Sequence, residues 1–465
     1  MTTATLTKIA VADPVVTPRP SAFDVRDSRA PRYTSYPTAL QFTGAVDSEV
    51  YGQWLAALDP AERVSLYVHV PFCSRLCWYC GCHTRVVNKA SLISDYVENL
   101  VEELALVEAR LPGRLGAGAL HLGGGTPNML SRDDLVRLFG ALRHVFRFAP
   151  GIEISAELDP ATLTEAWVKA AAYHGLTRAS LGVQDLAPHV QEAVNRIEPF
   201  ETVQRAVGWL RAAGVASINL DLMYGLPRQT IADVRSTLDA VLTLRPERIA
   251  LFGYAHVPWA KPHQRLLPEA ELPGAEARFE QSQAAAERLV AAGYVAIGID
   301  HFALPEDGLA VTKAAGRLRR NFQGYTADTC QTLLGFGASS IGRLPQGYVQ
   351  NLPAEVAWRD AIASGRLPVA RGLQMTEDDR LRGEVIERLM CDFSVDLSRV
   401  ALGHGFGVSV FAEDLAALQA LVHEGLAVVR DNRVEVTTRG RPYVRLIAQV
   451  FDRRSTGGDG FSKVI

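Results

Sequence analysis

Four of the six cysteines lie close together in the segment CSRLCWYCGC, residues 73–82, here called the cysteine loop. Cys73, Cys77 and Cys80 are spaced C-x3-C-x2-C, and Cys82 follows two positions later. In a reducing cytosol such a group is more often metal-binding or catalytic than disulfide-bonded. Structural zinc sites usually pair two separated C-x2-C units or combine cysteines with histidines. Three thiolates can instead hold three irons of a [4Fe–4S] cluster and leave the fourth iron open to a ligand, so we favour an iron–sulfur site over zinc or chance clustering.

The elements that must position this loop alternate between strand and helix from residue 65 onward. Short runs of β-forming residues are separated by stretches with apolar residues at helical spacing. We expect strands at 65–70, 119–125, 152–158, 179–185, 217–225, 248–257 and 294–304. We expect helices at 91–111, 131–146, 164–175, 230–244 and 275–292, and two helical stretches over about 188–213.

This alternation predicts right-handed βαβ units and a parallel sheet. About six units are too few to close an eight-unit barrel, so we expect an open or partial barrel, with an open doubly wound sheet as the competing architecture. Residues 305–372 break the alternation, and we expect them to be rich in loops. A helical segment from 377 leads to a hairpin with turn residues Asp431 and Asn432, which indicates a separate C-terminal domain resembling a winged helix.

Glycine or polar residues follow six successive predicted strands, and the carboxyl ends of barrel strands carry catalytic groups. Besides the cysteine loop, these residues are the turn GGGTP at 123–127, Glu157, Gln184, Asp221 and Ala255–His256. Glycines let backbone N–H groups approach a ligand's carboxylate. The carboxylates of Glu157 and Asp221 can bind an ammonium group or a ribose hydroxyl. Each residue taken singly is structural about as often as functional, but together they predict one ligand-binding rim.

Composition places the chain among soluble globular proteins. It has 465 residues, of which 48% are hydrophobic and 21% charged, which excludes a largely disordered chain and fibrous rods. The net charge of −3 provides no broad basic surface, so we expect no nucleic-acid partner. No apolar run reaches the roughly 18 residues that span a bilayer, and the N-terminus lacks the apolar core of a secretory signal. We therefore expect a cytoplasmic protein without a membrane partner.

Several segments, in order, resemble one family. The C-x3-C-x2-C spacing, with the aromatic Tyr79 before the third cysteine, is the signature of the radical S-adenosylmethionine (SAM) superfamily. Within that superfamily the chain resembles the oxygen-independent coproporphyrinogen III oxidases. The segments that carry this resemblance are PRYTSYPTA, YVHVPFCSRLCWYCGC, HLGGGTPNML, SAELDP, SLGVQD, NLDLMYGLP, GYAHVP and RNFQGYT.

The resemblance implies a partial (β/α)6 radical SAM barrel with an N-terminal arm and a mainly helical C-terminal domain. We place the arm at 1–57, the barrel at 58–305, a barrel extension and linker at 306–372, and the C-terminal domain at 373–465. The segment PRYTSYPTA at 31–39 is either a solvated part of the arm or an aromatic segment that folds back over the site.

The resemblance also implies one [4Fe–4S] cluster and two SAM molecules. Cys73, Cys77 and Cys80 match the cluster ligands, whereas Cys82 matches a cysteine that is needed for activity but binds no iron. Positions that contact the first SAM are matched by Tyr67, Gly124, Glu157 and Ile341. Positions that contact the second are matched by Tyr79, Gly125, Thr126, Gln184, Arg196, Asp221 and Ala255. His69 lies near the cluster in sequence and is expected to tune it through hydrogen bonding.

The implied reaction converts coproporphyrinogen III to protoporphyrinogen IX by turning two propionates into vinyl groups. An electron from an unidentified donor cleaves SAM, and the resulting radical abstracts a hydrogen atom from the propionate, which then loses CO2 and an electron. We expect a monomer. Since arginine forks suit carboxylates, the candidates for propionate contacts are Arg32, Lys261, Arg265, Arg319 and Arg320, although each taken singly is more often a solvated charge.

The alternative function is that of a related heme-binding chaperone, which shares the barrel and cluster loop but lacks oxidase activity. Those relatives carry an aromatic residue at the position of Cys82 and lack the PRYTSYPTA and RNFQGYT segments. This chain has all three features, which favours the oxidase. A non-catalytic zinc module is a more distant alternative.

Overall fold

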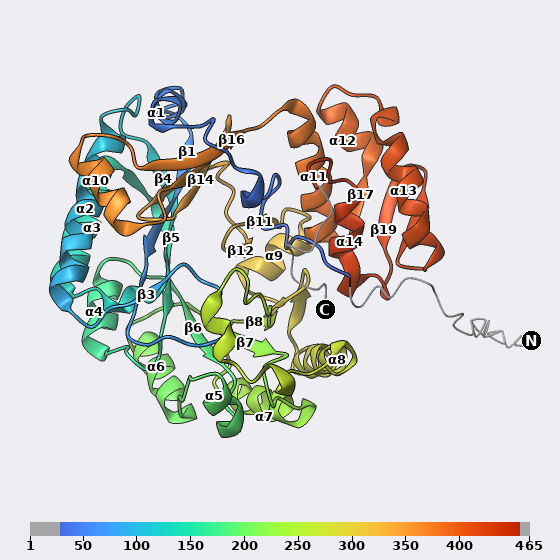
Figure 1. Cartoon of the computed structure of the whole chain (residues 1–465), viewed down its shortest axis with the longest axis horizontal. Helices are drawn as coiled ribbons and strands as arrows, with labels where there is room; N and C mark the ends of the chain where they lie inside the picture. The colour runs from blue at the N-terminus through green and yellow to red at the C-terminus, as the bar shows by residue number, and fades with distance from the viewer. Residues whose placement is uncertain (1–27, 456–465) are drawn as a thin grey trace, which may run out of the picture.

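A twelve-stranded sheet organises the computed structural model of the chain, which describes residues 28–455 (Figure 1). The strand order is β16-β15-β14-β13-β1-β4-β5-β6-β7-β8-β10-β9. Its central strands run parallel: β13 (Thr332–Phe336), β1 (Arg63–Val70), β4 (Gly116–Gly124), β5 (Arg147–Leu158), β6 (Arg178–Gln184), β7 (Ser217–Tyr224) and β8 (Arg248–Gly253).

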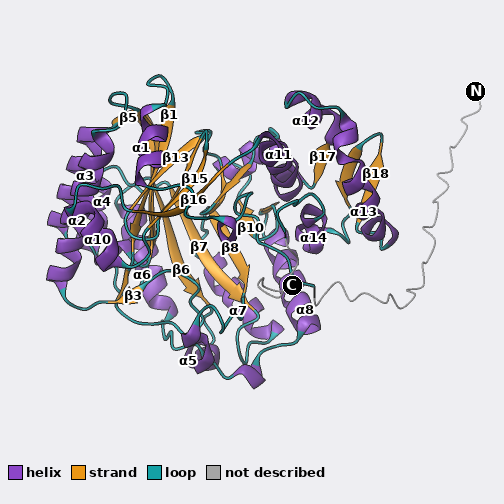
Figure 2. Cartoon of the chain, turned by 45° about the horizontal axis from the view of Figure 1, so that its top comes forward, coloured by secondary structure: helices purple, strands orange, loops and turns teal. Residues whose placement is uncertain are grey.

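Helices connect these strands and lie along the outside of the curved sheet (Figures 1 and 2). They are α2 (Ala90–Glu108), α3 (Arg132–Val145), α4 (Glu165–Tyr173), α5 (Pro188–Ala193), α6 (Phe200–Ala212), α7 (Ile231–Leu242) and α8 (Ala275–Ala291). Ser131 caps α3 through a capping box with Asp134, as the predicted helix start requires. Within residues 28–455 no helix is both long and apolar enough to cross a membrane.

From β1 to β8 the strand order follows the chain order, which decides between the two predicted architectures. Right-handed crossovers between neighbouring strands taken in sequence place every helix on the same face. A doubly wound sheet instead reverses its strand order at a switch point. The sheet has β16 at one end and β9 at the other, so the partial barrel is confirmed.

Two sequence predictions, for residues 294–304 and 305–372, were wrong. The segment 294–304 forms the antiparallel pair β9 (Val295–Ile297) and β10 (His301–Ala303), because Gly298, with φ of 56°, lies in the turn between them. The segment 305–372 is rich in regular structure rather than in loops. It contains α9 (Gly308–Ala314), β11 (Arg319–Asn321), β12 (Gly324–Thr326), β13, β14 (Ile341–Leu344), β15 (Gly347–Asn351), α10 (Glu355–Ala363) and the start of β16 (Val369–Gln374). These short strands are stabilised by pairing with one another and with β1, which local sequence patterns do not reveal.

The C-terminal part is mainly helical, as predicted. Its helices are α11 (Glu377–Asp392), α12 (Leu397–Gly403), α13 (Ala412–His423) and α14 (Val444–Gln449). Its small sheet has the order β17 (Ser394–Asp396), β19 (Arg433–Val436), β18 (Ala427–Arg430). The predicted hairpin is confirmed, and Asp431 and Asn432 both have positive φ, as a type I′ turn requires. The domain boundaries stay predictions.

The described part of the arm, from residue 28, folds back between the barrel and the C-terminal part. The Tyr33 hydroxyl donates a hydrogen bond to Asp452 at 2.9 Å, and Arg445 donates to the carbonyl of Ala30 at 3.2 Å. Arg320, on β11, donates to the Tyr33 carbonyl at 3.2 Å. Tyr33 and Tyr36 are both buried in the C-terminal core. Of the two interpretations of the PRYTSYPTA segment, folding back is confirmed, and residues 1–27 lie outside the described residues.

We predict that Tyr33→Ala lowers the free energy of unfolding by about 3–5 kcal/mol, because it removes a buried aromatic ring and leaves Asp452 without its donor. Tyr173→Ala is the matched control, since Tyr173 is 86% exposed, and should change stability by less than about 0.5 kcal/mol. Urea denaturation followed by circular dichroism measures both. Equal midpoints for the two variants would show that the arm is not part of the core.

Candidate active site

The inner face of the sheet borders a cavity of about 1270 Å³. Alternate residues of the strands point into it, for example Ser180 on β6 and both Asn219 and Asp221 on β7, while their neighbours in sequence pack under the helices. The arm, β11 and α14 also contribute to the wall. Of the predicted site residues, those lining the cavity are Tyr79, Cys80, Cys82, Glu157, Gln184, Asp221 and Ala255.

The cysteine loop begins at β2 (Phe72–Cys73), directly after β1, and every candidate ligand sulfur accepts a hydrogen bond. Thr126 donates to Cys73 Sγ at 3.5 Å, Arg196 to Cys77 Sγ at 3.4 Å, and the backbone N–H of Cys82 to Cys80 Sγ at 3.4 Å. A hydrogen bond from the Cys82 thiol further stabilises the Cys80 thiolate, and the pKa of Cys80 falls to about 6. Hydrogen-bonded thiolates are the ligands that iron–sulfur clusters take.

A short segment after β8 supports the cysteine loop. Within residues 28–455 no three His, Cys, Asp or Glu side chains converge closely enough to hold one metal ion. The loop is braced from η3 (Pro262–Leu266) and the residue before it, since His263 donates to the Cys80 carbonyl at 2.8 Å and Lys261 to the Cys82 carbonyl at 2.9 Å.

The glycine turn after β4 packs directly against the cysteine loop. A Cβ atom on Gly124 would lie 2.5 Å from Cε1 of His69, and one on Gly125 would lie 2.6 Å from the carbonyl oxygen of Phe72. Gly124 also has φ of 109°, which side chains rarely adopt. Only glycine therefore allows this turn and the loop to approach each other so closely.

Glu157 ends β5 beside this turn and is held as a carboxylate. It accepts hydrogen bonds from the N–H of Gly124 at 3.0 Å and from His121 at 3.1 Å. His121 contacts Ser155 at 2.6 Å through its other nitrogen and stacks on the ring of Tyr67. Burial raises the pKa of Glu157, but the hydrogen bonds from His121 and Gly124 bring it below its usual value. An ionised carboxylate here suits an ammonium group.

His69 connects Tyr67 to the cysteine loop. Burial lowers its pKa, so the ring is neutral near pH 7. Its Nε2 donates to the carbonyl of His83 at 3.0 Å, and its Nδ1 therefore accepts from the Tyr67 hydroxyl at 3.0 Å. The hydrogen bond that His69 donates therefore goes to the backbone of His83, just after the cysteine loop.

Asp221 on β7 is a second carboxylate that faces the cavity. It accepts hydrogen bonds from Ser180 at 2.9 Å and Asn219 at 2.7 Å, and burial raises its pKa to about 6. Its environment therefore differs from that of Glu157, whose pKa is lowered. Two carboxylates on β5 and β7, with β6 between them, therefore differ in the direction of their pKa shifts.

Arg196 connects the cysteine loop to two buried carboxylates. It is 8% exposed and forms ion pairs of 3.1 Å with both Asp159 and Glu198 while donating to Cys77. It also donates to the carbonyl of Gly182, close to Gln184, which ends β6 with φ of 70°. Burial raises the pKa of Glu198 to about 7.

Three further predicted residues are Tyr79, Ala255 and Ile341. Gln264 donates to the carbonyls of Tyr79 at 2.9 Å and Ala255 at 3.3 Å and so joins them. Ile341 begins β14, packs against the cluster that contains Phe42 and Tyr348, and is not among the residues that line the cavity, so its contact with SAM stays a prediction.

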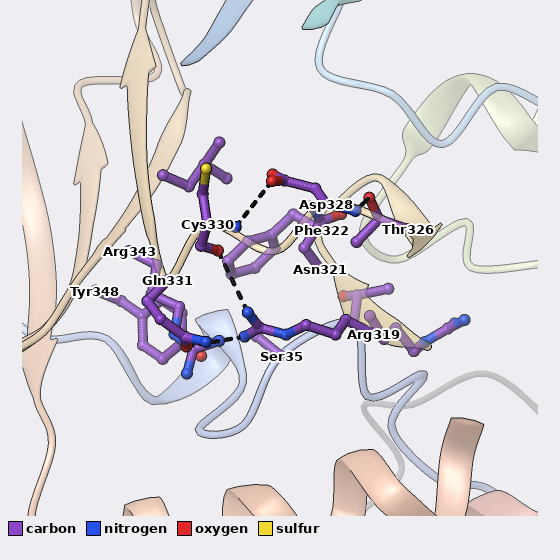
Figure 3. Close-up of a pocket in the computed structure, with 13 residues that line it drawn as sticks. Ser35, Arg319, Asn321, Phe322, Thr326, Asp328, Cys330, Gln331, Arg343 and Tyr348 are labelled. Carbon is purple, nitrogen blue, oxygen red and sulfur yellow. Dashed lines mark hydrogen bonds between the residues drawn. The ribbon is translucent and has the colours of Figure 1, made fainter. Parts of the chain in front are cut away.

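The five cations considered as candidates for propionate contacts lie in different places. Arg32 and Arg320 line the cavity. Lys261 binds the cysteine loop, and Arg265 is exposed. Arg319 lies in a second pocket of about 40 Å³, where it donates to the Cys330 carbonyl and to Gln331 (Figure 3).

Sequence reasoning missed His121, Ser180, Asn219 and Gln264. The first three had a signal, because each lies an even number of residues before a chosen rim residue on the same strand. His121 lies two residues before Gly123, Ser180 four before Gln184 and Asn219 two before Asp221. Gln264 had none, since only the fold brings η3 to the cysteine loop.

Comparison with known proteins agrees with this geometry. Residues 67–241 match the Radical SAM superfamily, and residues 375–443 match the HemN C-terminal domain. The oxygen-independent coproporphyrinogen III oxidase of Bradyrhizobium diazoefficiens is 46% identical over 426 residues, covering 92% of this chain and 95% of that protein. That of Paracoccus denitrificans is 43% identical over 440 residues, covering 94% and 97%. This chain belongs to the oxygen-independent coproporphyrinogen III oxidase family.

A solved structure from this family supports the same assignment. The coproporphyrinogen III oxidase of Escherichia coli, a radical SAM enzyme, matches with a TM-score of 0.87 and 36% identity, covering 91% of this chain and 98% of that one. The predicted family is therefore confirmed. The chain is an oxidoreductase of a superfamily that uses a [4Fe–4S] cluster and SAM.

We predict that Arg196→Met lowers the free energy of unfolding by about 3 kcal/mol, because two buried carboxylates lose their buried partner and keep, within residues 28–455, only the ion pairs with Arg75, at 3.6 Å from Asp159 and 3.4 Å from Glu198. The loss should shrink as pH falls below 7, since protonation of Glu198 removes one buried charge. Lys169→Met breaks the exposed pair with Glu165 and should cost less than about 1 kcal/mol. Denaturant titrations at two pH values test this, and a small, pH-independent loss for Arg196→Met would contradict it.

Proposed function

We propose that this chain converts coproporphyrinogen III to protoporphyrinogen IX without oxygen, as a step of heme biosynthesis in the cytoplasm. The observation that carries the proposal is the cysteine loop at the rim of a cavity of about 1270 Å³, in a chain that matches the family over nearly its whole length. Sites for small ligands usually measure about 300–1,000 Å³, so this cavity has room for a tetrapyrrole beside a cofactor.

In this proposal Cys73, Cys77 and Cys80 hold one [4Fe–4S] cluster, and Cys82 stays free. The cluster and SAM, when bound, supply the one-electron chemistry that removes a hydrogen atom from a propionate. Three donors, Thr126, Arg196 and the N–H of Cys82, stabilise the thiolates. The free Cys82 side chain faces the cavity, where substrate would lie.

Two SAM molecules are proposed, and the two carboxylates suit them differently. The carboxylate of Glu157, beside the glycine turn, would receive the ammonium group of the first SAM close to the cysteine loop. Asp221, held by Ser180 and Asn219, would receive a hydroxyl or ammonium group of the second. The arm and the C-terminal part cover the opposite wall and would exclude water from the reacting propionate. The monomeric state and an unidentified electron donor belong to the same proposal.

Substitutions in the cysteine loop should separate cluster binding from turnover. Anaerobic incubation of the wild type with coproporphyrinogen III, SAM and a reductant should give the divinyl product. Cys77→Ser should lose the iron, because a hydroxyl is a poor ligand for iron–sulfur clusters. Cys82→Ser should keep iron and the visible spectrum but make no product. Cys330→Ser, outside the loop, should keep both.

Iron and sulfide analysis with chromatography of the porphyrin products measures these outcomes. A Cys82→Ser variant that loses its iron would make Cys82 a fourth ligand. A wild type that cleaves SAM but leaves all four propionates intact would reject the oxidase function.

The raised pKa of Asp221 predicts a pH dependence of SAM affinity. Because its pKa is about 6, the carboxylate is ionised above that pH and accepts a hydrogen bond from SAM. Affinity should therefore fall by about tenfold for each pH unit below 6. Asp221→Asn should bind SAM about 10- to 150-fold more weakly at pH 7.5 and lose this dependence.

Calorimetric titration of the cluster-loaded protein between pH 5 and 7.5 checks this prediction. Glu157 does not confound it, because the pKa of that carboxyl is lowered. A variant with the same pH profile as the wild type would exclude Asp221 from SAM binding.

A further inference from the structure

Three arginines from separate parts of the chain meet on the cavity wall beside β8. Arg32 comes from the arm, Arg278 from α8 and Arg320 from β11, and all three line the cavity. Arg32 donates to the carbonyl of Gly253 at 3.0 Å, and Arg278 donates to that of the next residue, Tyr254, at 2.7 Å. Arg320 donates to the carbonyl of Arg32 itself at 3.4 Å. The three guanidinium groups therefore share one small region.

No carboxylate within residues 28–455 forms an ion pair with any of the three. Their hydrogen bonds go to backbone carbonyls. Asp300, which raises the pKa of Arg32 and Arg320, is hydrogen-bonded to His301 at 2.6 Å. Burial raises the pKa of Asp300, but His301, Arg320 and Arg32 bring it down to about 2, so this single charge stays ionised and only partly balances the arginines.

Two of the other arginines that line the same cavity are paired with carboxylates. Arg248 pairs with Asp307 at 2.8 Å, and Arg178 pairs with Glu153 at 3.0 Å. Arg445 of α14 also lines the cavity, and burial together with Arg32 and Arg320 lowers its pKa, so positive charge gathers on the wall beside β8. Desolvation lowers the pKa of Arg32 and Arg278, and a neighbouring arginine adds to the lowering in each case, although Tyr224 opposes it in both and Asp300 opposes it for Arg32.

Two of these groups also carry hydrogen-bond donors that nothing in residues 28–455 satisfies. Nη1 of Arg320 and Nε of Arg278 are buried without a partner, and Arg320 is only 8% exposed. A buried donor without an acceptor costs stability unless a ligand supplies one. The planar guanidinium fork matches a carboxylate with two parallel hydrogen bonds.

We propose that Arg32, Arg278 and Arg320 form a subsite that binds a propionate carboxylate of the porphyrinogen. The inference rests on the proposed function, because that substrate carries four propionates. It also explains why the arm lies where it does, since the arm contributes Arg32 and is held by Arg320 through two backbone carbonyls. Arg278, which sequence analysis did not select, replaces Lys261, Arg265 and Arg319 among the candidate cations.

The test compares a porphyrin with and without its carboxylates. Full-length, cluster-loaded protein is titrated with coproporphyrin III and with its tetramethyl ester, and binding is followed by porphyrin fluorescence. Arg278→Gln and Arg320→Gln should each weaken binding of the acid by about 10- to 100-fold and leave the ester unchanged. Arg178→Gln is the matched control, because Arg178 lines the same cavity but is already paired, and should change affinity by less than about threefold.

Each outcome decides the proposal. Unchanged affinity for the acid in Arg278→Gln would overturn it, as would equal losses for acid and ester. A parallel titration with SAM identifies the other source of a carboxylate, and a loss of SAM affinity alone would also overturn it. If Arg320→Gln unfolds, shown by thermal denaturation, Arg278→Gln and the partial rescue expected of Arg278→Lys decide the result.

The same preparations separate this inference from the proposed function. Divinyl product from the wild type together with normal acid binding by the arginine variants would reject the subsite and keep the oxidase. Arginine-dependent binding of the acid without any turnover by the wild type would keep the subsite and reject the oxidase.

Discussion

The parallel order of the strands from β1 to β8 is the constraint on which the rest of the structure depends. Because neighbouring strands follow the chain order and run in the same direction, their carboxyl ends meet at one edge and their helices lie on one face. The inner face is therefore left without helices, and polar residues at alternate strand positions point into the cavity. The cysteine loop, the glycine turn and the two carboxylates come together for this single reason.

Close backbone approach then fixes the site in detail. The glycine turn lies so near the cysteine loop that a single methyl group on Gly124 or Gly125 would overlap His69 or Phe72. The N–H of Gly124 is thereby directed at Glu157, and Thr126 at Cys73. A ligand bound between the turn and the loop would meet an ionised carboxylate and a hydrogen-bonded thiolate within one rigid unit.

The cavity wall has two regions that differ in whether their arginines form ion pairs with carboxylates. Near the cysteine loop, Arg196 is buried with Asp159 and Glu198, so its role is to hold the loop rather than to attract an anion. Beside β8, the arginines lack acidic partners and face the cavity. Because the arm and the C-terminal part complete that wall, both are tied to the region of the proposed propionate subsite.

The sequence by itself determined the family, the iron–sulfur loop, the six strand–helix units and most rim residues, because these depend on local spacing. C-x3-C-x2-C, the GGGTP turn, and carboxylates at strand ends can all be recognised within a few residues of chain. Only the tertiary structure decided the rest. The strands of 305–372 exist through pairing with distant partners, Gln264 reaches the cysteine loop from η3, and Arg278 meets Arg32 across 246 residues of chain. Such contacts depend on which surfaces the fold brings together, and no local pattern records them.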